Sequence, residues 1–294
     1  MLPKVAITLG DPAGIGPEIA RKAAADPRVC AACAPVFYGP DESALARFTP
    51  GEISARGGRA SYDAIVQAVR DAMGRRVDAI ATAPVNKEAF ARAELPWLGH
   101  TDLLGHLTGA RRVAMMFHSP QLRVVLATVH VPLAAVSRTL TRERADEVIA
   151  LTAEELPRFG YASPRLAFAA LNPHAGERGL MGSEDDEILR PAVDAARARG
   201  VRIDGPIPAD TLFVRALRGE FDAVIACYHD QGQIPVKLVS FGTAVNVTIG
   251  LPIIRTSVDH GTAYDIAGRN VADASSMIEA VLLAAQLARH ASAA

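Results

Sequence analysis

Short apolar runs alternate with amphipathic stretches along most of this chain. Brief runs rich in β-branched and aliphatic residues indicate buried strands, and apolar residues spaced three and four apart indicate helices. We expect strands at 5–9, 36–38, 77–81, 113–117, 123–129, 165–171 and 222–228, and helices at 61–73, 141–156, 185–199 and 271–290. Because strands alternate with helices, the pattern predicts a largely parallel α/β fold.

Turn formers mark the borders of several of these elements. A Ser-Pro turn separates the runs at 113–117 and 123–129, which predicts a hairpin or two adjacent strands. Residues 39–60 are rich in turn formers and show little periodicity, and 205–211, with its Gly and Pro residues, predicts a loop. Thr141 is a typical N-cap for the helix that follows it.

Composition limits the class of protein. The 294 residues are enough for two domains or one large α/β unit, and half of them are hydrophobic. A formal net charge of -1 gives no sign of a nucleic-acid partner or an acidic membrane surface, and no apolar run reaches the ~18 residues of a membrane span. Three cysteines, an odd number, fit a reducing compartment. Cys30 and Cys33 form a CxxC pair without a second ligand pair nearby, so we expect no metal or redox role there.

Polar residues gather after apolar runs in the stretch from 222 to 268. His229 ends the first run, and Lys237, Asn246 and Arg255 each lie beside a further short run. In open α/β sheets, ligands bind outside the carboxyl ends of the strands. These residues are therefore candidates for one shared site, although ordinary turn chemistry is the alternative for each of them alone.

Earlier strand ends carry further candidates. The glycine-rich stretch 10–18 is either a tight strand-to-helix turn or a cradle for an anion, and its Pro17 suits the first position of a helix. Lys87 follows another strand and is either a site residue or a surface lysine. Thr101 could cap the next helix, and His100 beside it could hydrogen-bond an anion at the same helix start.

Three histidines share one context. His130, His174 and His229 each follow an apolar run, in LRVVLATVH, RLAFAALNPH and DAVIACYH. Neutral imidazole is a common ligand of divalent metals, and three protein ligands with an open position is the arrangement of catalytic metal sites. Each histidine alone could be structural, but the repeated placement predicts a shared metal site.

The chain resembles the 4-hydroxythreonine-4-phosphate dehydrogenase family of pyridoxal phosphate biosynthesis. The matching segments run through nearly the whole chain in the family's order: ITLGDPAGIGPE, TAPVNKEAF, GHTDLLGHLTG, TVHVPL, LNPHAGERGLMGSE, GPIPADTLF, YHDQGQIPVK and VNVTIGLPIIRTSVDHGTAYDIAG. The resemblance implies a divalent metal, zinc, magnesium, cobalt or manganese, held by His130, His174 and His229. It also implies a homodimer whose active site lies at the subunit interface, with His229 contributed across that interface.

The resemblance also assigns roles to other residues. It implies substrate contacts from His100, Thr101, Lys237, Asn246 and Arg255, and it places Asp210 near the reacting centre. Asp210 and Lys87 are candidates for the group that accepts the proton.

A more distant similarity links the family to isocitrate and isopropylmalate dehydrogenases. The stretch 260–268 resembles their nucleotide-binding loop, which implies that His260, Gly261, Thr262 and Asp265 contact NAD or NADP. It also implies two α/β/α domains around a cleft. We expect the first domain at 1–125 plus 255–294 and the second at 126–254.

The expected reaction is a metal- and NAD-dependent oxidation of 4-(phosphooxy)-threonine with decarboxylation to 3-amino-2-oxopropyl phosphate, in the cytoplasm. The segment 39–60 is shorter than in many family members, so 4-phospho-D-threonate, 4-phospho-D-erythronate or a dihydrodiol carboxylate is the alternative substrate. A metal-dependent phosphatase and a metal-binding protein without catalysis are rivals from other classes.

Overall fold

The computed structural model describes residues 2–97 and 99–293. The chain divides into two compact units. Unit 1 comprises Met1–Val113 with Val245–Ala294, and unit 2 comprises Ala114–Ala244. The chain therefore leaves the first unit and returns to it, at borders that lie somewhat before the expected ones at 125 and 254.

Unit 1 contains a sheet in the strand order β2-β1-β3-β10-β9. The first four strands run parallel, and β9 runs antiparallel to β10. Its strands are β1 (Lys4–Thr8), β2 (Ala34–Tyr38), β3 (Ala79–Thr82), β9 (Val245–Ile249) and β10 (Arg255–Ser257), and its helices are α1 (Gly16–Ala24), α2 (Pro27–Ala32), α3 (Glu42–Leu45), α4 (Ala55–Met73), α5 (Lys87–Arg92), α6 (His100–Thr108) and α12 (Ser275–Ala293).

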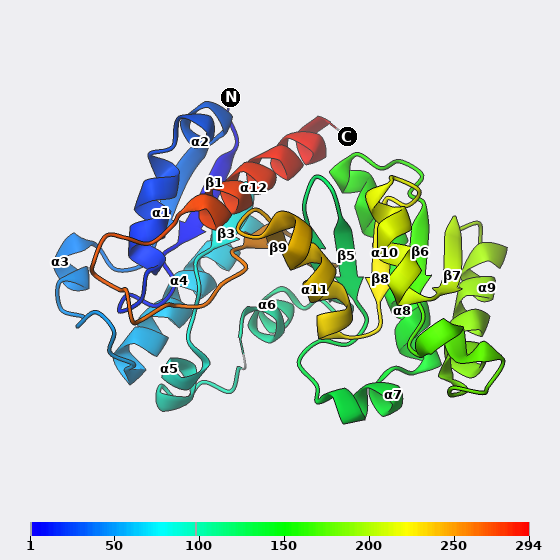
Figure 1. The fold of residues 1–294 in the computed structure, drawn as a ribbon. Helices are drawn as coiled ribbons and strands as arrows, with labels where there is room; N and C mark the ends of the chain where they lie inside the picture. The colour runs from blue at the N-terminus through cyan, green and yellow to red at the C-terminus, as the bar shows by residue number, and fades with distance from the viewer. Residues whose placement is uncertain (1, 98, 294) are drawn as a thin grey trace. The chain divides into compact units, whose positions relative to one another are not determined.

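Helices cover both faces of this sheet (Figure 1). On one face, Ile7 of β1 packs with Ile19 of α1 and Met277 of α12 in a buried apolar cluster. On the other face, Ile80 of β3 packs with residues of α4 and α6, among them Leu103. Successive side chains along each strand thus pack into two separate hydrophobic cores, one on each face, as expected for a parallel sheet between two helical layers.

Unit 2 contains a sheet in the order β4-β5-β8-β6-β7. The predicted hairpin is confirmed, because β4 and β5 pair antiparallel, and the remaining pairs are parallel. Its strands are β4 (Ala114–His118), β5 (Arg123–Leu126), β6 (Leu166–Ala169), β7 (Ile203–Ile207) and β8 (Ala223–Ala226). Its helices are α7 (Val136–Thr139), α8 (Arg142–Glu155), α9 (Arg190–Ala198), α10 (Ala209–Leu217) and α11 (His229–Ser240), with short turns η1 (Leu133–Ala135), η2 (Leu156–Phe159), η3 (Pro173–Glu177) and η4 (Asp185–Leu189).

Both faces of the second sheet are covered as well (Figure 1). Leu212 of α10 and Val236 of α11 pack with Val124 and Val224 of the strands in one buried cluster, while α8 contacts β5 and α9 contacts β7. The predicted α/β class with a largely parallel sheet is therefore confirmed. The predicted N-cap is confirmed too, since the Thr141 side chain accepts a hydrogen bond from the backbone N–H of Arg144.

Two local predictions were wrong. The segment 205–211 is not a loop, because it contributes to β7 and to the first turn of α10. Pro206 is tolerated there since β7 is the edge strand of its sheet, where a missing N–H costs nothing. The segment 39–60 is partly helical: Asp41 caps the short helix α3, and Ser54 caps α4, which begins six residues before the expected Ser61.

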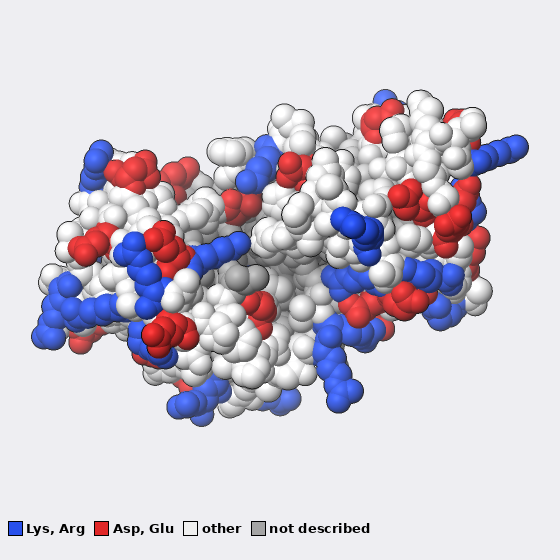
Figure 2. Space-filling view, turned by 90° about the horizontal axis from the view of Figure 1, so that it is seen from below, with Lys and Arg blue, Asp and Glu red and all other residues white. Residues whose placement is uncertain are grey.

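The surface carries charges of both signs. Figure 2 shows Lys and Arg side chains interspersed with Asp and Glu over the visible face, without one large patch of a single sign. This mixture agrees with the formal net charge of -1. Among the described helices, none combines the length and the apolar character that crossing a membrane requires.

Candidate functional site

A buried arginine lies on an interior strand of the unit 1 sheet. Arg255 begins β10 and is only 2 % exposed. Its Nε and Nη2 donate hydrogen bonds to the Thr82 hydroxyl at 3.2 and 2.7 Å, and its Nη1 donates to the Thr248 hydroxyl at 2.9 Å. Within the described part of the chain, no carboxylate pairs with this guanidinium. Burial lowers the pKa of Arg255 to about 9, so it remains a cation at neutral pH.

Two polar atoms without partners accompany this cation. The Nε2 of His100 and the Oδ1 of Asn246 are buried and have no hydrogen-bond partner among the described residues. Burial, followed by the charge of Arg255, lowers the pKa of His100 well below its ordinary value, so the imidazole is neutral. Asn246 lies two residues before Thr248 on β9, and the two side chains therefore share the face that Arg255 contacts.

This arrangement fits an anionic ligand. A buried charge is costly unless it is paired, and buried polar atoms normally have hydrogen-bond partners. Arg255 has five N–H donors, three of which are used in the bonds to Thr82 and Thr248. The remaining donors and the neighbouring imidazole suit the oxygens of a phosphate or a carboxylate.

Helix α6 begins at His100, which puts the imidazole at the positive end of a helix. The cap position belongs to Gly99, and no side chain caps this helix start. The capping interpretation of Thr101 is therefore wrong, because Thr101 is the second residue inside the helix. Its hydroxyl remains a candidate for contact with a ligand.

Lys87 is the first residue of α5 and is exposed. It follows the carboxyl end of β3 after a short connection whose last residue, Asn86, caps the helix by accepting from the Ala89 N–H. The lysine thus lies near the strand end that carries Thr82, as expected for a residue at the ligand-binding edge of the sheet.

The turn between β1 and α1 holds the expected cofactor loop in place. The backbone N–H of Ile15 donates to the Thr262 carbonyl at 3.0 Å. A Cβ at Gly14 would lie 2.8 Å from that same carbonyl oxygen, so only glycine allows this approach. Thr262 is buried, whereas His260, Gly261 and Asp265 are exposed and accessible to a ligand. The glycine-rich stretch is therefore a tight strand-to-helix turn that supports a neighbouring loop.

The three histidines of unit 2 follow three adjacent strands, β5, β8 and β6. The ring centroids of His130 and His229 are 5.8 Å apart. The Nδ1 of His229 lies 2.7 Å from a carboxylate oxygen of Asp230, an arrangement that orients the ring. Among the described residues of one chain, no three such side chains come close enough to form a complete metal-binding group. The two rings therefore lie close together within one chain, whereas the resemblance implied that His229 comes from a partner subunit. The metal site with His174, and its division between subunits, stays a prediction.

His174 lies on a strained turn. His174, Ala175, Glu177 and Arg178 all have positive φ angles between 44° and 57°. Such conformations cost about 1–3 kcal/mol each for non-glycine residues and cluster at functional sites. The segment that precedes this turn is held in place by hydrogen bonds to one carboxylate.

That carboxylate belongs to Asp185, which is fully buried. It accepts hydrogen bonds from the backbone N–H groups of Leu171 and Asn172, at 2.8 and 3.0 Å, and from the Asn172 side chain at 3.0 Å. Asp185 also opens η4, a π-helical turn, a feature frequent at functional sites. The segment before His174 is thereby fixed in position.

The two remaining candidates of unit 2 lie on helices. Lys237 is on α11, the helix that His229 begins, eight residues or about two helical turns further along. Asp210 is exposed in the first turn of α10, directly after β7. Both helices start at the carboxyl end of a strand, where α/β sheets bind ligands.

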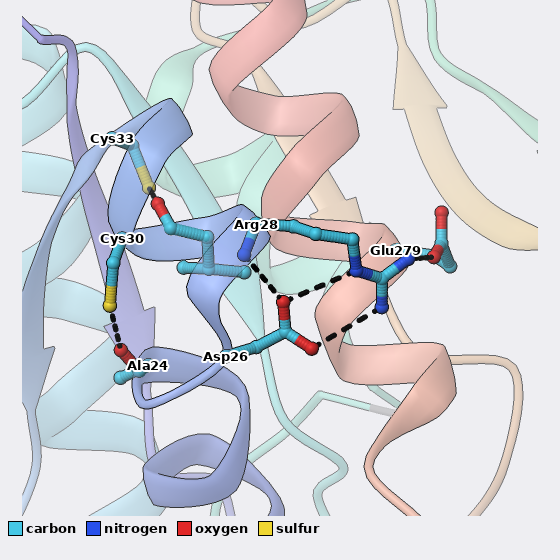
Figure 3. A network of polar contacts seen from close by, with 7 residues as sticks. Ala24, Asp26, Arg28, Cys30, Cys33 and Glu279 are labelled. Atoms are coloured by element: carbon cyan, nitrogen blue, oxygen red, sulfur yellow. Dashed lines mark hydrogen bonds and ion pairs between the residues drawn. The ribbon is translucent and has the colours of Figure 1, made fainter.

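The CxxC pair forms no joint site. The Cys30 thiol donates to the Ala24 carbonyl at 3.3 Å, and the Cys33 thiol contacts the Val29 carbonyl at 3.7 Å, so the two sulfurs point to different partners (Figure 3). Burial raises the pKa of Cys33 to about 11, which keeps that thiol protonated. The neighbouring network of Asp26, Arg28 and Glu279 ties α2 to α12.

Several residues of these sites have no motif of their own in the sequence. Thr82 and Thr248 end or interrupt apolar runs, which is the only local signal that they carry. Asp11 lies three residues after β1 and has the same local signal, but its partner Tyr264 lies 253 residues away. The sequence around Asp185 predicts only the start of an amphipathic helix.

Comparisons with known proteins agree on one family. Residues 18–284 match the profile of the pyridoxal phosphate biosynthetic protein PdxA. A 4-hydroxythreonine-4-phosphate dehydrogenase from Geobacter metallireducens is 45% identical over 98% of this chain and 96% of its own length. A D-threonate 4-phosphate dehydrogenase from Cupriavidus necator is 42% identical over 98% of both chains.

Solved structures show the same relationship. A 4-hydroxythreonine-4-phosphate dehydrogenase from Klebsiella pneumoniae has a TM-score of 0.89 and 40% identity, covering 98% of both chains. An isocitrate dehydrogenase from Methylococcus capsulatus has a TM-score of 0.52 at 18% identity, covering 98% of this chain and 88% of its own, a likeness of fold alone. The predicted isocitrate dehydrogenase-like fold class is therefore confirmed.

Proposed function

The chain belongs to the family of the pyridoxal phosphate biosynthetic protein PdxA and is a dehydrogenase, and on that premise we propose that it oxidises a phosphorylated hydroxy acid with NAD or NADP. One observation carries the choice of an anionic substrate. The buried Arg255 guanidinium has no carboxylate partner among the described residues and lies beside the neutral His100. A substrate phosphate would supply the missing counter-charge.

The first candidate substrate is 4-(phosphooxy)-threonine. Oxidation of its hydroxyl gives a ketone β to the carboxylate, and loss of carbon dioxide then gives 3-amino-2-oxopropyl phosphate. The second candidate is 4-phospho-D-threonate. The relatives support both candidates about equally, because a protein named for the threonate is 42% identical to this chain and one named for hydroxythreonine phosphate is 45% identical.

The residues of unit 1 would bind the anionic end of the substrate and the cofactor. Arg255 would take the phosphate, with His100 Nε2 and the Thr101 hydroxyl donating to its oxygens, and Asn246 would bond a neighbouring polar group. Fixing the reacting geometry in this way can lower a barrier by several kcal/mol. NAD or NADP supplies the hydride acceptor and would lie on the exposed residues of the cofactor loop, His260, Gly261 and Asp265, beside Thr262.

A divalent metal would be held by His130, His174 and His229. When bound, such a metal favours loss of the proton from a substrate hydroxyl and stabilises negative charge on the oxygen. Two observations support the assignment: the 5.8 Å separation of the His130 and His229 rings and the strained backbone at His174. Lys237 would contact the substrate from α11, and Asp210 and Lys87 are the candidate proton acceptors.

We propose that a second copy of the chain completes this site. Helix α11 begins at His229, and its exposed side carries Ile234, Leu238 and, at the helix end, Phe241, which are 58, 80 and 82 % exposed. A contiguous exposed apolar surface of this kind is typical of a subunit interface. A homodimer would bury it and bring a metal ligand of one subunit to the site of the other. Three free thiols among the described residues suit the reducing cytoplasm, the proposed location.

A side-by-side assay tests the proposed function. Purified protein with a divalent metal is given 4-(phosphooxy)-threonine, 4-phospho-D-threonate, 4-phospho-D-erythronate and a dihydrodiol carboxylate, each with NAD and with NADP. We expect reduced cofactor from a phosphorylated substrate, and we expect Arg255→Ala to raise the KM for it. Phosphate release without reduced cofactor would instead identify a phosphatase, and an unchanged KM would remove Arg255 from the anion site.

A further inference from the structure

We infer that Thr82 is the positioning residue for Arg255 and that its hydroxyl sets the affinity of the site for the anionic substrate. This inference rests on the proposed function, in which Arg255 binds the phosphate. The Thr82 hydroxyl accepts two hydrogen bonds from the guanidinium, to Nη2 at 2.7 Å and to Nε at 3.2 Å. One side of the planar guanidinium is thus fixed against one oxygen atom.

The chemistry of arginine fixes the direction of the hydrogen bonds that the guanidinium makes in this cluster. A guanidinium only donates, so the Thr82 oxygen must accept both bonds. The single Thr82 proton has the Ser257 hydroxyl as its nearer acceptor, at 2.9 Å, and the Thr256 carbonyl as a more distant one, at 3.4 Å. The Ser257 hydroxyl in turn donates to the Thr82 carbonyl at 3.1 Å. The Thr82 hydroxyl therefore uses both of its acceptor lone pairs and its one proton, and Arg255 and Ser257 determine its orientation.

Sheet register brings these side chains together. Thr8, Thr82, Ser257 and Asn246 are successive Cα partners across β1, β3, β10 and β9, so their side chains form one row on the same face. All but Asn246 are buried. Arg255 precedes Ser257 by two residues and shares this face. The ends of the row, Thr8 Oγ1 and Asn246 Oδ1, have no hydrogen-bond partner among the described residues.

Among the described residues, the Thr82 hydroxyl is the one acceptor that bonds Nε and Nη2 of Arg255. Thr248 bonds only Nη1, on the other side of the guanidinium. Removing the Thr82 hydroxyl would leave two donors of a buried cation without an acceptor, which is costly and favours a different orientation of the side chain. The guanidinium would then present different N–H groups to the substrate.

Thr82→Val and Thr82→Ser separate the hydroxyl from the rest of the side chain. Valine keeps the shape and removes the oxygen, whereas serine keeps the oxygen and removes a methyl group. We expect Thr82→Val to raise the KM for the phosphorylated substrate roughly tenfold to hundredfold, as for loss of hydrogen bonds to a charged group, with a much smaller change in kcat. Thr82→Ser should remain within about threefold of the wild type.

Thr256→Val is the matched control. Thr256 is buried in the same sheet, next to Arg255 in the chain, and its side chain points to the opposite face, where its hydroxyl donates to the Ala280 carbonyl at 2.8 Å. The substitution removes the same atom from the same sheet without touching the guanidinium. It should lower the melting temperature in the same way as Thr82→Val and leave the KM unchanged.

The experiment measures KM, kcat, the inhibition constant of inorganic phosphate and the melting temperature for all three variants and for Ser257→Ala. A raised KM and weaker phosphate inhibition in Thr82→Val, with recovery in Thr82→Ser, support the inference. If Thr82→Val does not fold, a raised KM in Ser257→Ala, which removes the nearer acceptor of the Thr82 proton, supports it, and an unchanged KM overturns it. A folded Thr82→Val with the KM of the wild type overturns it as well. Should Arg255→Ala raise the KM while Thr82→Val does not, the proposed function stands and only this inference fails.

Discussion

The Tyr264 hydroxyl donates a hydrogen bond to the Asp11 carboxylate over 2.9 Å and joins an N-terminal and a C-terminal segment of the chain inside unit 1. Asp11 is only 1 % exposed, and its other oxygen accepts from the Ala13 N–H at 2.9 Å. Because Tyr264 belongs to the expected cofactor loop, this bond fixes that loop to the turn after β1. The bond between Ile15 and the Thr262 carbonyl acts at the same junction.

Tyr264→Phe removes this hydroxyl and keeps the ring. We expect a loss of about 1 kcal/mol in unfolding free energy, the typical contribution of one hydrogen bond. We also expect the substitution to raise the KM for the nicotinamide cofactor more than the KM for the substrate, because the anchored loop is the one proposed to hold the cofactor. Direct binding of NADH, followed by its fluorescence, checks this independently of turnover.

Tyr62→Phe is a suitable control for that variant, since Tyr62 is in α4 of the same unit and its ring, not its hydroxyl, contacts Arg59. It should leave cofactor binding unchanged. Equal cofactor affinity in Tyr264→Phe and the wild type would show that the bond to Asp11 does not support the cofactor loop.

Asp11→Asn should change how stability depends on pH. Burial raises the pKa of Asp11 above its ordinary value of 3.8, although the bonds from Ala13 and Tyr264 oppose this. The folded state therefore binds the proton more tightly than the unfolded chain does. The stability that this group contributes is fully present below pH 3.8 and is lost as the pH rises through the raised pKa.

Asparagine does not ionise, so the variant does not lose this stability as the pH rises. The unfolding free energy of Asp11→Asn minus that of the wild type should increase as the pH rises from about 4 through the raised pKa of Asp11. Urea unfolding at several pH values measures this difference, in which other titrating groups largely cancel. A difference that is constant with pH would mean that Asp11 titrates alike in the folded and unfolded states.

The sequence predicted the candidate site as far as local context allowed. His130, His174 and His229 could be selected because each follows an apolar run, and the strand order β5-β8-β6 places those runs side by side. Arg255 could be selected for the same reason. Its partner Thr82 could not, because the two are 173 residues apart and meet only through the register of β10 with β3.

Other features depend on conformations that residue types do not specify. Asp185 supports the His174 turn only because η4 turns its carboxylate toward the backbone of Leu171. In the stretch 205–211, Gly and Pro predict a loop, whereas the structure has an edge strand, which accepts Pro206.

The thiols should react at very different rates. Cys30 is exposed, whereas Cys33 and Cys227 are buried, and burial raises the pKa of both buried thiols. The thiolate is the reactive form, so a disulfide reagent should modify one thiol rapidly in the native protein and the others only slowly. Cys30→Ser should abolish the fast phase. Rapid loss of two thiols together would contradict the separate environments of Cys30 and Cys33.

Mixed dimers test whether two subunits share the metal ligands. If the His174 and His229 of one metal site come from different subunits, a dimer of one His174→Ala chain and one His229→Ala chain has one intact site. Each variant alone should be inactive, and mixing them after dissociation should restore roughly a quarter of the wild-type activity. No recovery in verified mixed dimers would mean that all three ligands come from one chain.

The central claim is that the three histidines hold a metal on which oxidation of the phosphorylated substrate depends. Bound metal and NAD(P) reduction should be measured together for the wild type, for His174→Ala and for His106→Ala, which removes an imidazole that packs on Trp97. We predict that His174→Ala loses metal and turnover together, while His106→Ala keeps both. Full turnover by a His174→Ala protein without bound metal would contradict the account.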